Sequence, residues 1–253
     1  MSRPEETPRA AASGRESGHA HEGQDLALAG ERRKRFGPEF IPLNLSAPFI
    51  RRPVATTLLT IASSALVAYG FARFNFPFKK QLFAILIATL MLPNSVIIIP
   101  RYVLFNKFGW VDSYMPFWVP ALLACYPFFI YQLIQFMRGI PRDLDESACI
   151  DGCGTFRIFW QILLPLMKPA LFSAGLFQFL WTYNDYFNSL IFINSVKKYT
   201  ISLALRLSVD AESVVVWGRV MAMACVAVLP LVLLFFAAQK YFVEGIATSG
   251  LKG

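Results

Sequence analysis

Residues 53–72 read PVATTLLTIASSALVAYGFA, and this stretch decides the fold class of the chain. It carries no charged residue and is followed directly by Arg73. A helix rises about 1.5 Å per residue, so about twenty residues cross the roughly 30 Å hydrocarbon core of a bilayer. The stretch therefore predicts a helix that spans a membrane.

Four more apolar runs follow, and each is also long enough to cross a membrane. They cover residues 82–100, 114–137, 169–193 and 220–238. The runs could also be buried helices of a soluble protein. Helices of soluble proteins usually keep a polar face, however, which argues against a soluble fold. We therefore expect an all-α fold, a polytopic membrane helical bundle with five apparent spanning helices. Prolines inside the runs predict that some of these helices are kinked.

Composition and charge exclude other classes of protein. Apolar residues make up 56% of the 253 residues, above the roughly 45–50% of soluble domains, and the length leaves no room for a separate catalytic domain. Outside the N-terminal tail, the basic residues behind the net charge of +8 lie in short stretches between the apolar runs. This distribution is typical of membrane proteins and argues against a nucleic-acid partner.

Side chains suited to catalysis or metal binding are scarce. The two histidines, His19 and His21, lie in the polar N-terminal tail, and no histidine is near Cys149 and Cys153. Neither a zinc site nor a Ser/His/Asp or Cys/His set can be assembled from these residues. We expect the chain to be no enzyme and to hold no metal and no cofactor.

The chain divides into three parts. Residues 1–45 are polar, lack an apolar period and predict a disordered tail. Residues 46–240 hold the apolar runs and predict the membrane domain, and residues 241–253 predict a cytoplasmic C-terminal tail. Within the membrane domain, residues 139–168 form a loop that is too polar for lipid.

The core of this loop reads PRDLDESACIDGCGTFRIFWQILLP, residues 141–165. Asp143 and Glu146 have the spacing of a capping box, and Gly152 is a suitable stop, so we expect a two-turn helix over residues 144–151. A second helix is predicted over residues 155–164, ended by Pro165. A short helix presented by a membrane bundle suits docking into the groove of a partner.

The spacing of residues in the loop resembles a known motif. The loop is similar to the EAA loop of ABC transporter permeases. The similarity lies in the order and spacing of its residues: Glu146, a gap of four residues, Asp151-Gly152, a gap of nine residues, and Ile162-x-Leu164-Pro165. One position departs, because Ser147 stands where the motif has its first alanine, while Ala148 matches the second. Three further segments resemble permeases of the carbohydrate importer family: residues 68–74, 181–187 and 241–253. The last segment resembles the C-terminus of the second permease subunit of maltose-type and glycerol-phosphate-type importers.

The resemblance implies a function and a set of partners. It implies a binding-protein-dependent carbohydrate importer in a bacterial plasma (inner) membrane, with a second permease subunit, a cytoplasmic ATPase dimer that binds the ATP, and an extracytoplasmic solute-binding protein. It also implies which residues couple the chain to the ATPase: Glu146, Ser147, Ala148, Asp151, Gly152, Ile162, Leu164 and Pro165.

This chain departs from the family near its N-terminus. Members usually have six spanning helices, and the helix expected before residue 53 is missing here. Arg51 and Arg52 also stand where the family is usually apolar or uncharged. If the loop is cytoplasmic, residues 1–52 lie outside and hold nine of the 24 basic residues, which conflicts with the positive-inside tendency.

Asn184 and Asp185 are the second candidate site. Asp185 lies about 24 Å along a helix that starts near Pro169, so its carboxylate belongs in the outer half of the bilayer. Such a group is costly in lipid and should face the bundle, the partner subunit or a water-filled path. Two readings stay open: a residue of the translocation path, or an anchor at a helix end. Asp185 is also the main argument for an alternative function, a secondary transporter or channel subunit.

Overall fold

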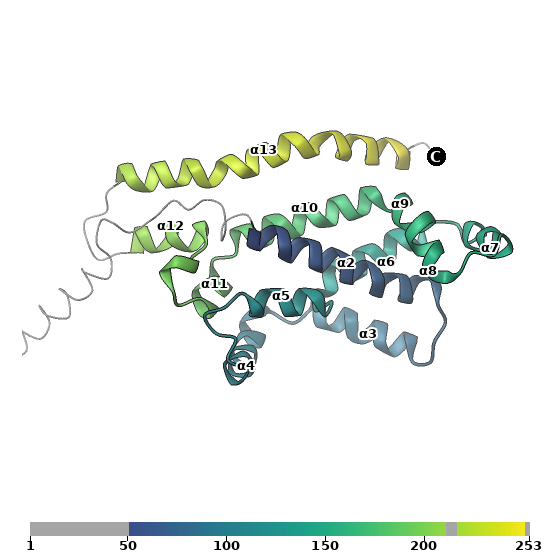
Figure 1. The fold of residues 1–253 in the computed structure, drawn as a ribbon, viewed down its shortest axis with the longest axis horizontal. Coiled ribbons are helices and arrows are strands. Elements are labelled where there is room, and N and C mark those ends of the chain that lie inside the picture. The colour runs from purple at the N-terminus through teal and green to yellow at the C-terminus, as the bar shows by residue number, and fades with distance from the viewer. Residues whose placement is uncertain (1–50, 211–216, 251–253) are drawn as a thin grey trace, which may run out of the picture. The chain divides into compact units, whose positions relative to one another are not determined.

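All regular elements of the described residues are helical (Figure 1). The computed structural model describes residues 51–210 and 217–250, except for the side chains of 197, 210, 219 and 237–250. In chain order the α-helices are α2 (Arg52–Arg73), α3 (Lys79–Leu90), α4 (Asn94–Lys107), α5 (Met115–Leu122), α6 (Pro127–Arg138), α7 (Asp143–Ile150), α8 (Thr155–Ile158), α9 (Leu164–Leu166), α10 (Lys168–Asn184), α11 (Phe187–Phe192), α12 (Ile201–Asp210) and α13 (Trp217–Gly250).

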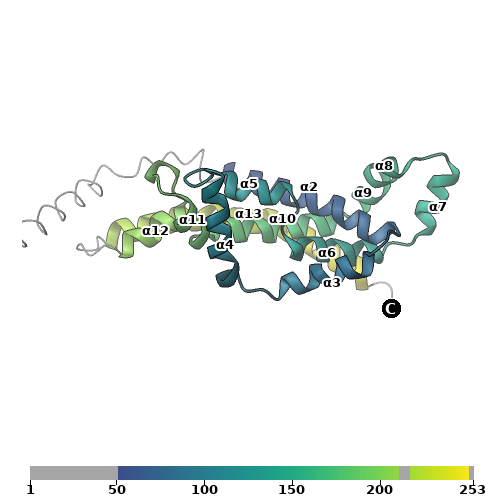
Figure 2. The ribbon, with the colours of Figure 1, turned by 90° about the horizontal axis from the view of Figure 1, so that it is seen from below.

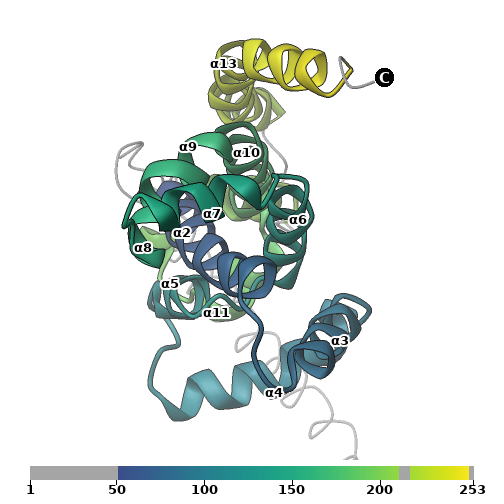
Figure 3. The same cartoon turned by 90° about the vertical axis from the view of Figure 1, so that its right-hand side faces the viewer.

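Helix α2 is the centre of the bundle. It packs against α5, α6 and α10, and Figure 3 shows it between them when viewed from the end that carries α7. Its buried face is built from small side chains, including Ser64, Ala65, Ala68 and Ala72. Small residues let helix backbones approach closely, which is how helices associate where lipid removes the hydrophobic driving force.

Larger side chains of α6 fill the space beside α2. Phe129, Leu133, Ile134 and Met137 are fully buried and belong to one core cluster with the small face of α2 and part of α10. Some polar side chains inside the bundle pair with one another. Gln178 of α10 donates to the Thr60 hydroxyl oxygen at 3.3 Å, which links the polar groups of α2 and α10 in the core.

The second apolar run is bent at a proline, as its sequence predicts, but the bend is a complete break rather than a kink in one helix. It is divided into α3 and α4, whose axes bend by 103° (Figure 2). Pro93 is the physical reason, because proline lacks an N–H and drives the preceding residue away from the helical region. Pro93 itself is extended, with φ −69° and ψ 142°, and α4 begins at the next residue.

The fourth run also ends earlier than expected. Helix α10 stops at Asn184, because Asp185 adopts an extended conformation with ψ 92°, and α11 follows as a separate short helix. By length and composition, two helical segments of the described residues could span a membrane, Arg52–Arg73 and Met115–Arg138. The number rises to four if each of two bent pairs is one span, and α13 contributes the shorter apolar segment Val220–Phe236.

The predicted N-terminal and C-terminal tails can be compared with the described residues. The predicted tail of residues 1–45 lies outside the described residues. Helix α13 continues to Gly250, so its backbone stays helical through most of the predicted C-terminal tail.

Candidate functional site

The first candidate site is the loop between α6 and α10, and its first helix ends as the sequence predicts. Gly152 has φ +78°, a conformation that strains any residue with a side chain. The Cys153 N–H donates to Ala148 O at 2.9 Å and the Gly152 N–H to Cys149 O at 3.0 Å. This is a Schellman motif, which fixes the end of α7 and the direction of the chain after it.

The predicted capping box is absent, and that expectation was wrong. Helix α7 begins at Asp143 itself, after Arg142 in a helical conformation and without a side-chain cap. Asp145, which is not part of the predicted box, forms an ion pair with Arg73 of α2, with a distance of 2.9 Å between Oδ2 and Nε. The acidic residues of the first turn, Glu146 among them, still suit the positive end of the helix dipole.

The predicted coupling residues of α7 lie on two sides of the helix. Glu146, Ser147, Asp151 and Gly152 are exposed, whereas Ala148 is 5% exposed and belongs to the core cluster of this chain's own bundle. Docking of these residues on a partner stays a prediction. The burial of Ala148 indicates that its small side chain serves the contact between α7 and the bundle.

The second half of the loop differs from its prediction at Pro165. After α8, residues Phe159–Leu163 form a π-turn in which the Leu164 N–H bonds to Phe159 O, and the helix then continues to Leu166. Pro165 therefore does not end the helix, because a widened turn removes the clash of its ring with the preceding turn. Ile162 and Leu164 are partly buried, and Pro165 is exposed.

The end of α2 holds both halves of the loop. The Arg73 guanidinium donates to Ile140 O at 3.1 and 3.2 Å besides its ion pair with Asp145. Arg142 donates to Ala72 O at 3.3 Å, and the Tyr69 hydroxyl to Thr155 O at 2.9 Å. Sequence reasoning treated Arg73 only as the charge that closes an apolar run. Its place in the family-like residues 68–74 was the available signal.

The loop also presents apolar side chains to its surroundings, which sequence reasoning did not single out. Ile150 is 87% exposed, Phe156 66% and Trp160 52%. Exposed side chains of this size are suited to a contact with protein or lipid.

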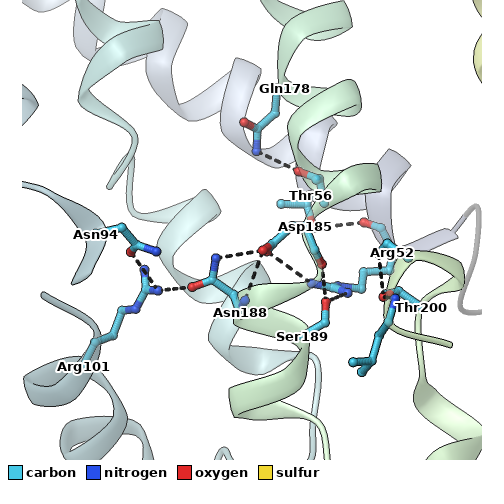
Figure 4. Close-up of polar contacts among 12 residues, drawn as sticks. Arg52, Thr56, Asn94, Arg101, Gln178, Asp185, Asn188, Ser189 and Thr200 are labelled. Carbon is cyan, nitrogen blue, oxygen red and sulfur yellow. Dashed lines mark hydrogen bonds and ion pairs between the residues drawn. The ribbon is translucent and has the colours of Figure 1, made fainter. Parts of the chain in front are cut away.

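The second candidate site lies where α10 gives way to α11 (Figure 4). Asp185 accepts hydrogen bonds from the Asn188 backbone N–H at 3.1 Å and from its side-chain amide at 2.9 Å. Its other carboxylate oxygen lies 4.0 Å from Nη2 of Arg52, the first residue of α2. The carboxylate is thus turned toward the interior of the bundle, as its cost in lipid requires.

Two arginines from other helices complete this cluster. Arg52 is 1% exposed, donates to the Ser189 hydroxyl oxygen at 2.9 Å, and places its guanidinium 3.6 Å from the centre of the Phe117 ring. Arg101 of α4 donates to the side-chain oxygens of Asn188 and Asn94. We call this set the polar cluster: Arg52, Asn94, Arg101, Asp185, Asn188 and Ser189. Sequence reasoning found Asp185 but not the arginines that surround it.

Asn184 faces a different side from Asp185. It lines a cavity of about 420 Å³ between α10, α12 and α13, together with Tyr183 and Tyr186. Trp181 is directed elsewhere and packs against Phe128 and Phe129 of α6. The two adjacent candidate residues therefore belong to two different environments.

A further polar contact joins two loops near the polar cluster. Asp112, between α4 and α5, accepts hydrogen bonds from the backbone N–H groups of Asn194 at 3.0 Å and Ser195 at 2.7 Å. Lys198 forms an ion pair with it at 3.1 Å. The hydrogen bonds from the Ser195 hydroxyl and N–H hold the pKa of the Asp112 carboxyl well below its usual range. Within the described residues, no group of three His, Cys, Asp or Glu side chains could hold a metal ion.

Comparison with known proteins accounts for the loop and the bundle. The family described as "Binding-protein-dependent transport system inner membrane component" matches residues 60–248. The chain belongs to this family. Its members are membrane permease components of ABC transporters, not enzymes, and the fold is their membrane helical bundle.

Individual relatives agree with this family. The trehalose/maltose transport system permease protein MalG of Thermococcus litoralis is 30% identical over 197 residues, covering 78% of this chain and 71% of its own. The arabinooligosaccharides transport system permease protein AraQ of Bacillus subtilis is 32% identical over 200 residues, covering 78% and 69%. A crystal structure of a bacterial ABC transporter for alginate import matches with a TM-score of 0.62 and 19% identity, over 78% of this chain and 77% of that one.

Proposed function

We propose that this chain is a permease subunit of an ATP-driven, binding-protein-dependent importer for a carbohydrate, with several spans in a bacterial inner membrane. The relatives support the solute class, because the permeases they name carry trehalose and maltose or arabinooligosaccharides. The observation that carries the coupling role is the loop: a short helix, fixed by a Schellman motif and tied to α2, presents Glu146, Ser147 and Asp151 at one end of the bundle.

The proposed partners follow from this role. A second permease subunit would supply the other half of the translocation path, and a cytoplasmic ATPase dimer, which binds the ATP, would receive α7. An extracytoplasmic binding protein would deliver the solute at the opposite end. The secondary-transporter alternative loses its main support, because the Asp185 carboxylate is engaged within the polar cluster and the chain belongs to an ABC permease family.

The test uses the exposed side of α7. Ser147→Arg should abolish sugar-stimulated ATP hydrolysis by the reconstituted importer, because an arginine cannot enter a groove that accepts a small residue. Ser147 is exposed, so the folded chain should tolerate the change, whereas the buried Ala148 would not separate docking from folding. The measurements are ATPase activity and copurification of the ATPase with the permease.

The control is Arg157→Gln, an exposed charge change on the following helix of the same loop. It should leave sugar-stimulated ATP hydrolysis near the wild-type rate. Normal coupling in the Ser147→Arg variant would refute the docking of α7.

A further inference from the structure

We propose that the polar cluster is a solute subsite and that it takes a carboxylate-bearing sugar, with Arg101 as the residue that contacts the carboxylate. This inference rests on the proposed function, because it names the solute class of the same importer.

Two helix breaks meet at the cluster. Asn94 is the first residue of α4, directly after the 103° bend, and Asp185 lies in the break between α10 and α11. Arg101 links the two breaks, because it donates to Asn94 on one side and to Asn188 on the other (Figure 4). Irregular backbone at membrane depth is tolerated where it is buried in protein or lines a polar path, and broken helices mark substrate sites in transporters.

The cluster carries a surplus of positive charge. It contains two guanidinium groups, from Arg52 and Arg101, and one carboxylate, from Asp185. Among the described residues, the other nearby acid, Asp112, is already paired with Lys198. An uncompensated cation away from water is costly, so this arrangement favours an anionic guest.

Guanidinium N–H groups without a hydrogen-bond partner also favour an anionic guest. Nε and Nη2 of Arg52 and Nε of Arg101 are buried and have no hydrogen-bond partner among the described residues. A guanidinium presents its N–H groups in a fork that matches a carboxylate. Arg52 is almost fully buried and acts by positioning Asp185 and Ser189, whereas Arg101 and Asn188 are partly exposed, and Asn94 is exposed. The accessible side of the cluster is thus the side of α4.

An aromatic surface lies beside Arg101. The Arg101 guanidinium is 5.5 Å from the centre of the Phe192 ring, and Tyr102 stacks on the same ring with centroids 6.2 Å apart. Tyr102 is 37% exposed. A cation, two amides and an exposed aromatic ring together fit a saccharide, whose ring has an apolar face and hydroxyl edges.

The test measures direct binding to the complete importer in lipid nanodiscs, without the external binding protein. The probes are digalacturonate, its neutral counterpart galactobiose, and acetate as a bare carboxylate. We expect digalacturonate to bind more tightly than either of the others. Arg101→Gln should weaken its binding at least about tenfold, the loss of one charge-assisted contact, while galactobiose binding changes little.

The matched control is Lys107→Gln, which removes the same charge from an exposed position near the end of α4. It should leave digalacturonate binding unchanged. The proposal is overturned if galactobiose or acetate binds as tightly as digalacturonate, if Arg101→Gln has no effect, or if digalacturonate fails to bind in the millimolar range. Failure of the proposed function would look different: deleting the chain would leave uptake of every saccharide intact.

Discussion

Single polar residues hold both ends of the bundle. Arg73 joins α2 to the loop at one end, and Asp112 joins two loops at the other. Asp112 has φ +60°, an unusual conformation for a residue with a side chain, and its carboxylate collects donors from residues more than eighty positions away. Such contacts outweigh local backbone strain because several hydrogen bonds to one charged group act together.

The depressed pKa of Asp112 predicts how this contact depends on pH. A group with a lowered folded pKa contributes stability that is fully present above its unfolded pKa, about 3.9 for aspartate, and is lost as the pH falls through the folded value. We therefore expect hydrogen-exchange protection of the Ser195 N–H, corrected for intrinsic rates, to stay constant from neutral pH down to about pH 5.

Asp112→Asn should lower the protection of Ser195 over this whole range, while Asp143→Asn, an exposed change at the other end of the bundle, should not. Equal protection of Ser195 in the wild type and in Asp112→Asn would show that the carboxylate does not hold this loop.

The role of a single residue could be predicted from the sequence where it depends only on that residue's own backbone conformation. Gly152 was recognisable as a helix stop because its role depends on its own φ angle. Arg52 and Arg101 were not recognisable, because their partners lie on other helices and no local pattern specifies them. For Arg73 the signal was its place in the family-like residues 68–74, not its partner Asp145. The capping box failed because Arg142 is already helical, so α7 begins at Asp143 and Asp143 cannot act as its cap.

Among the helices, α2 sets the spacing of its neighbours. Its buried small residues face α5, α6 and α10, and the Ser63 hydroxyl donates to Ala121 O of α5 at 2.6 Å. The run of small residues allowed this role to be suggested from sequence, whereas the division of the second run into α3 and α4 was missed. A proline in a hydrophobic run predicts a kink, but its angle depends on the surrounding helices.

Enlarging a small residue of α2 tests the close packing. Ala68 has no exposed surface, and Ala68→Leu should destabilise the bundle by about 1–3 kcal/mol through overpacking. The apparent melting temperature of the purified complex should fall. Leu66→Phe, on the half-exposed side of the same helix, is the control and should change it little. A melting temperature unaffected by Ala68→Leu would mean that α2 is not tightly packed there.

The molecule as a whole has two chemically different ends. The end with α7 carries Arg73, Lys79, Lys80, Arg138 and Arg142, and the opposite end holds the polar cluster and the Asp112 contact. Basic residues concentrate on the cytoplasmic side of membrane proteins, so the α7 end should face the cytoplasm. The helical bundle was predictable from the apolar runs, whereas the sites depend on contacts between runs. The orientation stays a prediction.

Single cysteines placed at two exposed asparagines test this orientation. Asn75 precedes α3 near the α7 end, and Asn194 follows α11 at the opposite end. In a background with Cys125, Cys149, Cys153 and Cys225 replaced by alanine, an impermeant maleimide added to whole cells should label position 194 and spare position 75. The reverse pattern would invert the topology and place the loop away from any cytoplasmic ATPase.

Helix α2 has one consequence for the transport cycle. Its 22 residues make it about 33 Å long, with the loop fastened at Arg73 and the polar cluster at Arg52. Because a helix of this length is nearly rigid, a small rotation about its loop end would become a larger sideways displacement at Arg52. A tilt of about 10° about the loop end would carry Arg52 about 6 Å sideways, more than enough to pull it away from Asp185 and Ser189.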